Sequence, residues 1–263
     1  MYDYHSHSSF SDDCSTPMKH MVEAAISLGI KEMAITDHYD PDYPDKNFPF
    51  DLDFEAYYHA LLDVEVNYSS KIKIIKGIEI GIQHGYTHIK CNTAAKAFPY
   101  DYILGSFHCC SGQDLYNEYF KTRSDEKGIK EFYDYVYKGI TDFNDFDVLG
   151  HINVIDRYAG KIPDYSQYME IIKLILKKLI EMGKGIEMNT SSFRYGLGDR
   201  TTPSSEILTL YKKLGGEIIT IGSDAHRESH VGFMYKEATE ILISHGFKYI
   251  TTFDKRVPTQ IRI

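Results

Sequence analysis

The stretch IIKGIEIG, residues 74–81, places one carboxylate, Glu79, inside a run of isoleucines. A short apolar run rich in β-branched residues predicts a buried strand. A carboxylate buried there lowers stability unless it is paired or binds a metal ion. Alternation leaves a second interpretation open, because Glu79 can face water if Ile78 and Ile80 face the core. The stretch therefore predicts a strand, and the role of its carboxylate depends on the rest of the chain.

Similar strand-like runs recur along the chain, with helix-like segments between them. Thr16-Pro17 and Thr202-Pro203 each open a helix-like segment as capping residue and first-turn proline, and a glycine closes each segment. Alternating strands and helices predict parallel strands joined by right-handed crossovers. Seven or eight such units predict an α/β fold, a TIM-like barrel rather than an open sheet, in one domain over residues 1–263. The expected strands are Tyr2–His5, Glu32–Thr36, Ile72–Ile80, Tyr102–Phe107, Asp147–Gly150, Gly185–Met188, Glu217–Ile221 and Tyr249–Phe253.

The composition of the chain is typical of a globular protein and argues against several other classes of protein. The 263 residues are 43% apolar and 25% charged, as in ordinary globular proteins, and no apolar run approaches the ~20 residues of a membrane span. The first residues, MYDYHSHSSFSDDC, lack the basic and apolar regions of a signal peptide. A net charge of −9 without a Lys/Arg run argues against nucleic acid as a partner. Four cysteines without CxxC spacing predict neither disulfides nor a cysteine zinc site, which is typical of a cytoplasmic protein.

Histidines mark the ends of several expected strands. AITDH (34–38), LGSFH (104–108), VLGHIN (148–153) and IGSDAH (221–226) each put a histidine where an apolar strand ends, and HSH (5–7) puts two on one face of the first strand. In a parallel barrel the C-terminal ends of all strands open on the same face. One such histidine is usually structural, but six at this position, together with carboxylates, predict a metal centre. The candidate ligands are His5, His7, Asp13, His38, Glu79, His108, His151, Asp224 and His226.

Nine candidate ligands are more than one metal ion can coordinate. A catalytic zinc ion typically has three protein ligands and one open position, so nine ligands predict two or three divalent ions with a carboxylate bridging a pair. Imidazole and carboxylate ligands without thiolate suit zinc, iron or manganese, and the residues do not choose among these metals.

Six motifs in a fixed order carry a family resemblance. HSH, TDH, GIEIG, SFH, GHIN and GSDAH, between Tyr2 and His226, resemble the polymerase-and-histidinol-phosphatase (PHP) superfamily. The resemblance implies a distorted (β/α)7 barrel with a di- or trinuclear metal centre at the C-terminal ends of the strands. Within the superfamily, the chain length and the segments GHINVIDRY (150–158) and GIEMNTSSFRYG (185–196) resemble the monofunctional histidinol-phosphate phosphatases.

The resemblance also implies how the ligands are shared among the ions. The position of Asp13 carries His in some members of the family and Asp in others, so the third set is the least uniform. The implied sets are His5, His7, Glu79 and Asp224 for the first ion, Glu79, His108 and His151 for the second, and Asp13, His38 and His226 for the third.

A centre of this kind supports hydrolysis of a phosphate ester. Two neighbouring ions lower the pKa of a bridging water and neutralise phosphate charge, so we expect a bridging hydroxide to attack phosphorus without a phosphoenzyme. Glu79 would take part by bridging the ions. Asp224 or a metal-bound water would deliver a proton to the departing alkoxide.

Two arginines are candidates for binding the phosphate. Arg157 and Arg194 lie in loops after expected strands, and arginine suits bidentate contact with phosphate. Asn189 and Ser192 could add hydrogen bonds. The alternative for either arginine is a solvated surface position, and Arg227 is a weaker third candidate.

The expected activity is that of a phosphomonoesterase that hydrolyses L-histidinol phosphate in histidine biosynthesis. The loop YDPDYPDKNFPFDLD (39–53) offers Asp40, Asp42 and Asp45 for the substrate amine and four aromatic side chains for its imidazole; surface decoration is the alternative for this loop and for residues 109–127. The first alternative function is another phosphoesterase of the superfamily, acting on nucleotides, oligonucleotides or phosphotyrosine. A metal-dependent amidohydrolase and a non-catalytic metal-binding domain are further alternatives, and the oligomeric state stays open.

Overall fold

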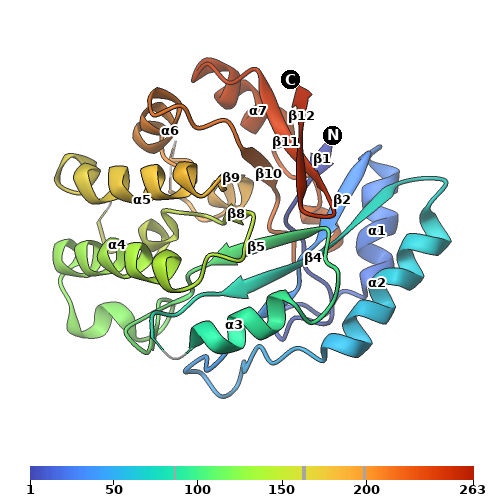
Figure 1. Ribbon diagram of the computed structural model, residues 1–263, viewed down its shortest axis with the longest axis horizontal. Helices are drawn as coiled ribbons and strands as arrows, with labels where there is room; N and C mark the ends of the chain where they lie inside the picture. Colours follow the sequence, from blue (N-terminus) through green and yellow to red (C-terminus); the bar gives the residue numbers. More distant parts are fainter. Residues whose placement is uncertain (86, 162–163, 198–199) are drawn as a thin grey trace.

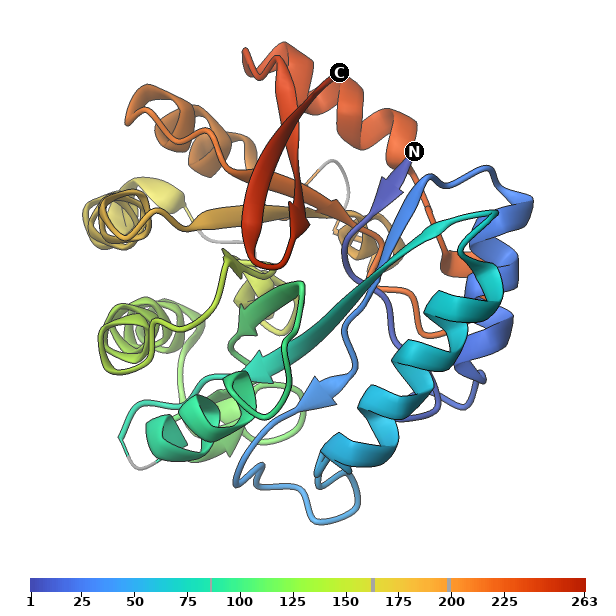
Figure 2. The same ribbon diagram turned by 45° about the vertical axis from the view of Figure 1, so that its right-hand side comes forward.

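Seven parallel strands, taken in chain order, form a nearly closed barrel in the computed structural model (Figures 1 and 2). The structure describes residues 1–85, 87–161, 164–197 and 200–263. The first and last strands meet through main-chain bonds from Tyr4 N to Ile221 O and from His7 N to Ala225 O, both 2.9 Å. The predicted (β/α)7 barrel is thereby confirmed. The barrel strands are β1 (Tyr2–Asp3), β2 (Glu32–Ile35), β4 (Lys73–Gly81), β5 (Tyr102–Ser106), β8 (Val148–Leu149), β9 (Gly185–Asn189) and β10 (Ile219–Gly222).

Helices surround the strands on the outside of the barrel (Figure 2). In α5 (Met169–Glu181) Ile172, Ile175 and Leu179 are buried at helical spacing, so the helix turns one apolar stripe inward. Gly183 follows α5 in the left-handed region (φ +68°), which glycine adopts without a Cβ clash. The other α-helices are α1 (Met18–Ser27), α2 (Phe54–Tyr68), α3 (Thr87–Ala95), α4 (Asp125–Asp142), α6 (Ser205–Lys213) and α7 (Tyr235–Ser244), and the short 3-10 helices are η1 (Tyr119–Thr122), η2 (Val154–Arg157), η3 (Tyr165–Gln167), η4 (Thr190–Arg194) and η5 (Glu228–His230).

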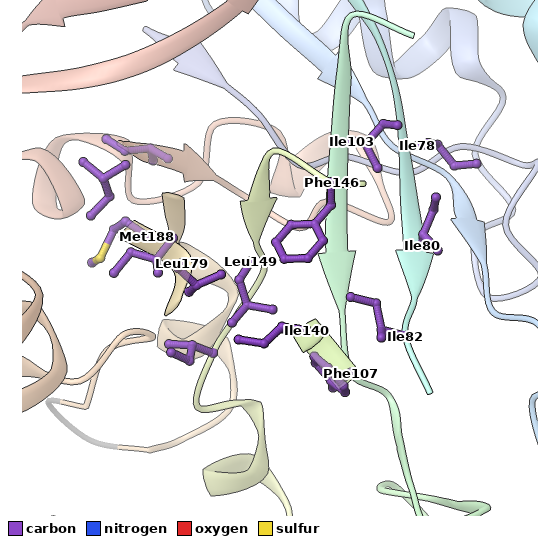
Figure 3. Close-up of a cluster of buried hydrophobic side chains, with 14 of the residues drawn as sticks. Ile78, Ile80, Ile82, Ile103, Phe107, Ile140, Phe146, Leu149, Leu179 and Met188 are labelled. Atoms are coloured by element: carbon purple, nitrogen blue, oxygen red, sulfur yellow. The ribbon is translucent and has the colours of Figure 1, made fainter. Parts of the chain in front are cut away.

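The strands separate two apolar regions. Figure 3 shows the outer region, where side chains such as Ile78, Ile80 and Ile103 meet those of the surrounding helices. Because neighbours in a strand point to opposite faces, Ile78 and Ile80 on the helix side direct Glu79 into the barrel. Glu79 is fully buried, so the interpretation that it faces water is wrong. The inner region consists of Tyr4, Ala34, Ile75, Tyr102, Leu104, Val148 and Phe253.

The last expected strand is not a barrel strand, so the barrel has seven units rather than eight. β11 (Tyr249–Asp254) pairs antiparallel with β12 (Val257–Arg262). The Phe253 ring lies 5.1 Å from the Tyr102 ring inside the barrel, and Arg256 Nε donates to Asp147 Oδ2 at 2.6 Å. Asp147 directly precedes β8, so the hairpin covers the N-terminal end of the barrel, as Figure 2 shows. The seven strands already close on themselves and leave no edge for an eighth.

Short strands extend the opposite, C-terminal face. β3 (His38–Tyr39) pairs with β4 and aligns His38 with Glu79. β6 (Cys109–Cys110) and β7 (Gln113–Asp114) form a small hairpin within the long loop after β5. These additions bring two long loops over the end of the barrel where the strands finish.

The four cysteines, Cys14, Cys91, Cys109 and Cys110, are buried free thiols. Among the described residues, no helix has the length and apolarity needed to cross a membrane.

Candidate metal centre

The nine predicted ligands converge at the C-terminal end of the barrel. Each comes from a strand or from the segment directly after one, and parallel strands bring all these positions to one face. Asp224 adopts the left-handed region (φ +53°), and its carboxylate lies beside His5 and His7, which follow β1. Most of the nine side chains are buried, and Asp13 is the most exposed at 36%.

The first implied set is assembled around one oxygen of Glu79. Glu79 Oε2 lies 3.1 Å from His5 Nε2 and 3.5 Å from His7 Nε2. The two Nε2 atoms are 3.0 Å apart. Asp224 Oδ1 lies 3.4 Å from His7 Nε2 and 3.7 Å from His5 Nε2. Four potential ligand atoms therefore surround one small volume.

The second implied set uses the other oxygen of Glu79. Oε1 lies 3.1 Å from His151 Nε2 and 3.4 Å from His108 Nε2, and these two nitrogens are 3.4 Å apart. One carboxylate thus faces two groups of histidines with one oxygen each. This is the arrangement that a bridging carboxylate requires.

The third implied set lies beside His7. The centroid of the His7 ring lies 4.2 Å from that of His38 and 4.2 Å from that of His226, and the centroids of His38 and His226 are 5.9 Å apart. Asp13 Oδ2 lies 3.0 Å from His226 Nε2 and 3.8 Å from His38 Nε2. His7 is close enough to contribute to this group as well as to the first.

The charges in the cluster support one another. Burial opposes ionisation of Glu79, but the surrounding imidazoles, His5 first, hold the pKa of its carboxyl well below the usual range. Burial likewise opposes protonation of His5, but nearby carboxylates, Glu187 first, raise its pKa. Burial and the neighbouring His226 lower the pKa of His7 to about 3. Glu79 is therefore ionised and His7 neutral, whereas the carboxylates around His5 favour its protonated form.

The donor set fits divalent cations. Ring nitrogens that face each other at 3.0 Å, as in His5 and His7, must share either a proton or a cation. The Nδ1 atoms of His38 and His151 are buried without a hydrogen-bond partner among the described residues. Several trios of donor atoms lie within 4.8 Å of one another and could hold ions. They include His5–His7–Glu79, Glu79–His108–His151 and His7–His38–His226.

Glu187 is a buried carboxylate of the centre that was not expected there. Its Oε1 lies 2.6 Å from His5 Nδ1, and its Oε2 accepts hydrogen bonds from His151 N (2.9 Å) and Asn189 Nδ2 (3.0 Å). A Cβ built on Gly222 would overlap Glu187 Oε1, so glycine leaves room for this carboxylate. A signal existed, because GIEMN (185–189) repeats the pattern of GIEIG (77–81), a carboxylate inside an apolar strand.

Of the four residues predicted to bind phosphate, two line a cavity beside the metal ligands and two do not. Arg157 and Ser192 line a cavity of about 310 Å³ above the cluster. Arg194 does not line it; its guanidinium donates to Ser223 O (3.0 Å) and Asp224 O (2.9 Å). Asn189 lies outside the cavity wall as well, bonded to Glu187.

Both long loops line the cavity. From residues 39–53, Tyr43, Asp45, Phe48 and Phe50 reach it. Asp42 does not, because its carboxylate binds Lys90 Nζ at 2.6 Å. The loop after β5 contributes two further side chains to the wall. They are Tyr116 and Asn117.

Known proteins are similar to this chain in sequence and in fold. The model of the PHP domain matches residues 3–191. The histidinol-phosphatase of Lactococcus lactis is 29% identical over 259 residues (95% of this chain and 93% of that protein), and a probable histidinol-phosphatase of Clostridium acetobutylicum is 31% identical over 269 residues (98% of each). The crystal structure of the L. lactis histidinol phosphate phosphatase, complexed with Zn, L-histidinol and phosphate, superposes with a TM-score of 0.89 at 26% identity, covering 98% of each chain.

Proposed function

This chain belongs to the PHP domain family, and on that premise we propose that it hydrolyses L-histidinol phosphate to L-histidinol and phosphate as a metal-dependent phosphomonoesterase. The observation that carries the proposal is the position of Glu79. Its two oxygens face two groups of histidines, and one of these groups, His108 and His151, lines a cavity whose wall also contains Arg157. The similar L. lactis enzyme, crystallised with Zn, L-histidinol and phosphate, supports this substrate.

We propose two or three divalent ions per chain, held by the nine ligands named above. The trios of donor atoms support at least two ions, and zinc in the similar structure supports zinc as one candidate. Ions held there would supply an activated water and neutralise phosphate charge. Manganese and iron suit the same ligands.

Arg157 is proposed to bind the phosphate. Its guanidinium lies 3.5 Å from the centre of the Tyr195 ring, and this stacking holds the side chain in place. No carboxylate pairs with Arg157 in the described part of the chain, so its N–H groups remain available. The planar guanidinium can then donate to two phosphate oxygens at once.

Asp224 is proposed to handle the proton. Its side chain lines the cavity. Burial opposes its ionisation, but His5 and His7 hold the pKa of its carboxyl well below the usual range. An ionised carboxylate at this position can accept a proton from the attacking water and pass it to the departing alkoxide oxygen.

The loop at residues 39–53 is proposed to recognise the leaving group. Asp45 lines the cavity and can pair with the substrate ammonium, and Tyr43, Phe48 and Phe50 can pack against its imidazole. A site built for these groups penalises a substrate that lacks them, because its own polar atoms then stay unpaired. This favours histidinol phosphate over nucleotides, oligonucleotides or phosphotyrosine.

We also propose that residues 1–263 act as one domain in the cytoplasm on a small phosphorylated substrate. Four buried free thiols support a reducing compartment, and the net charge of −9 argues against a nucleic-acid partner.

The test combines metal analysis with a substrate panel. The purified protein is assayed for bound transition metals and is then offered histidinol phosphate, a simple alkyl phosphate, a nucleoside monophosphate and phosphotyrosine with added zinc, manganese or iron. We expect more than one ion per chain and the highest kcat/KM for histidinol phosphate. A protein that neither contains nor takes up a transition metal, or equal kcat/KM for all four esters, would contradict the proposal.

A further inference from the structure

Asp40 joins two histidines that belong to different groups of the metal centre. Its Oδ1 lies 2.8 Å from His108 Nδ1, and its Oδ2 lies 3.4 Å from His38 Nδ1. The Nε2 atoms of these histidines point elsewhere, to Glu79 Oε1 at 3.4 Å for His108 and to Asp13 Oδ2 at 3.8 Å for His38. Asp40 is buried and is absent from the cavity wall, so it sits behind the centre and not in the path of the substrate.

Contacts on two sides fix the position of the Asp40 carboxylate. Asp40 N donates to Phe50 O at 3.1 Å, which closes the base of the loop at residues 39–53. On the other side lies Gly81, the last residue of β4, and a Cβ built on it would overlap Asp40 Oδ1. Glycine at this position therefore lets the carboxylate come close to the strand that carries Glu79.

The contacts of Asp40 have a direct consequence for metal binding. An imidazole that donates its Nδ1–H to a carboxylate keeps Nε2 unprotonated, and the hydrogen bond fixes the orientation of the ring. His38 Nδ1 forms no hydrogen bond among the described residues, but Glu79 Oε2 lies 3.1 Å and Asp40 Oδ2 3.4 Å from it. Because Glu79 is itself a proposed ligand, Asp40 is the carboxylate placed to accept a hydrogen bond from this nitrogen. We infer that Asp40 is a positioning residue that holds His38 and His108 ready to bind metal and couples their two groups. This inference rests on the proposed function.

The test measures zinc binding by the metal-stripped protein in competition with a chromogenic chelator. Asp40→Asn keeps the volume of the side chain, but its amide has one acceptor oxygen and can serve only one of the two Nδ1–H groups. We expect the same number of ions at saturation, with roughly 10–100-fold weaker binding of some of them. Asp142→Asn is the matched control, because Asp142 Oδ2 lies 2.5 Å from His84 Nδ1, outside the cluster, and wild-type zinc affinity is expected for it.

Two further measurements do not depend on Asp40→Asn. Gly81→Ala should weaken zinc binding in the same way, because its Cβ would displace the carboxylate. In the zinc-loaded wild-type protein, ¹⁵N NMR of labelled histidines should show both His38 and His108 protonated at Nδ1.

Several outcomes would overturn the role of Asp40. Unchanged zinc affinity in Asp40→Asn would do so, as would Nε2-protonated His38 or His108 in the wild type. Loss of one ion at saturating zinc would instead make Asp40 a ligand. A wild-type protein that binds no zinc contradicts the proposed function itself, so the two failures are distinguishable.

Discussion

Glu79 is buried in β4 between two isoleucines that face the helices, and its oxygens lie 3.1 Å from His5 Nε2 and 3.1 Å from His151 Nε2. The histidines on both sides stabilise its ionised form. An uncompensated carboxylate at this depth would destabilise the fold, so the histidines around Glu79 offset the cost of burying it.

Glu79→Gln is expected to remove most of the activity and to weaken metal binding while the fold stays intact. The amide has the same shape, but it carries no charge and presents one oxygen in place of two. Activity, bound metal and circular dichroism check this. Glu170→Gln is the control, because Glu170 is 90% exposed on α5, and no loss is expected there. Near-normal turnover in Glu79→Gln would contradict the bridging role.

Arg157→Ala is expected to lower kcat/KM and to weaken inhibition by inorganic phosphate, with the metal content unchanged. A charge-assisted contact of this kind contributes about 2–3 kcal/mol, which corresponds to a fall of roughly 30–150-fold. Steady-state kinetics with phosphate as inhibitor measure both effects. Arg262→Ala, at an exposed position on β12, serves as the control. Unaltered inhibition by phosphate would show that Arg157 lines the cavity without binding the phosphate.

Arg194 provides a contrast to Arg157. Its guanidinium donates to the main-chain oxygens of Ser223 and Asp224 and so supports the left-handed backbone of Asp224. Both arginines were expected to bind phosphate, and the structure favours that role for Arg157. For Arg194→Ala we expect a loss of bound metal together with activity, whereas weaker phosphate inhibition at full metal content would restore the original expectation.

At the scale of elements, the loop at residues 39–53 begins at the metal centre and ends at α2. Asp40 anchors its start, and Asp53 caps α2 by accepting a hydrogen bond from Ala56 N at 3.0 Å. The segment between these anchors supplies four side chains to the cavity wall. Because both ends of the loop are fixed, ordering the side chains that line the cavity costs only a modest amount of conformational entropy.

Asp45→Asn is expected to reduce kcat/KM for histidinol phosphate much more than for a simple alkyl phosphate. The substitution removes the charge that would pair with the ammonium and leaves the phosphate contacts unchanged. The ratio of the two kcat/KM values checks this. Asp42→Asn, whose carboxylate binds Lys90 and not the cavity, should keep the wild-type ratio. An equal fall for both substrates would contradict a recognition role for Asp45.

At the scale of the whole molecule, the two ends of the barrel differ in role: one carries the polar site, and the other is covered by a hairpin. The metal centre and the cavity occupy the C-terminal end, and the hairpin of β11 and β12 covers the N-terminal end. Phe253 from this hairpin packs against Tyr102, and its N–H donates to Tyr4 Oη at 2.9 Å. The chain thus places its stabilising contacts opposite its polar site.

Phe253→Ala is expected to lower the free energy of unfolding by about 3–5 kcal/mol, because it leaves a cavity in the barrel interior. Urea denaturation measures this change. Val257→Ala is the control, because Val257 is 62% exposed on the same hairpin, and a change within about 0.5 kcal/mol is expected. A similarly small effect of Phe253→Ala would show that the hairpin does not stabilise the barrel.

The sequence by itself determined the strand pattern, the barrel class and the positions of the nine candidate ligands. These features depend on local periodicity and on one general rule, that parallel strands end on the same face. His38, His108 and His151 could therefore be assigned to one site although they lie far apart in the chain.

Only the tertiary structure decided which partner each side chain has. In the structure Glu79 points into the barrel, and Arg194 donates a hydrogen bond to the main chain of Asp224. Asp40 lies next to two histidines of the centre, and the last expected strand lies outside the barrel. Such pairings depend on the register and distance between segments that are remote in sequence. A local pattern cannot specify them, because it fixes which face a side chain occupies and not what lies opposite.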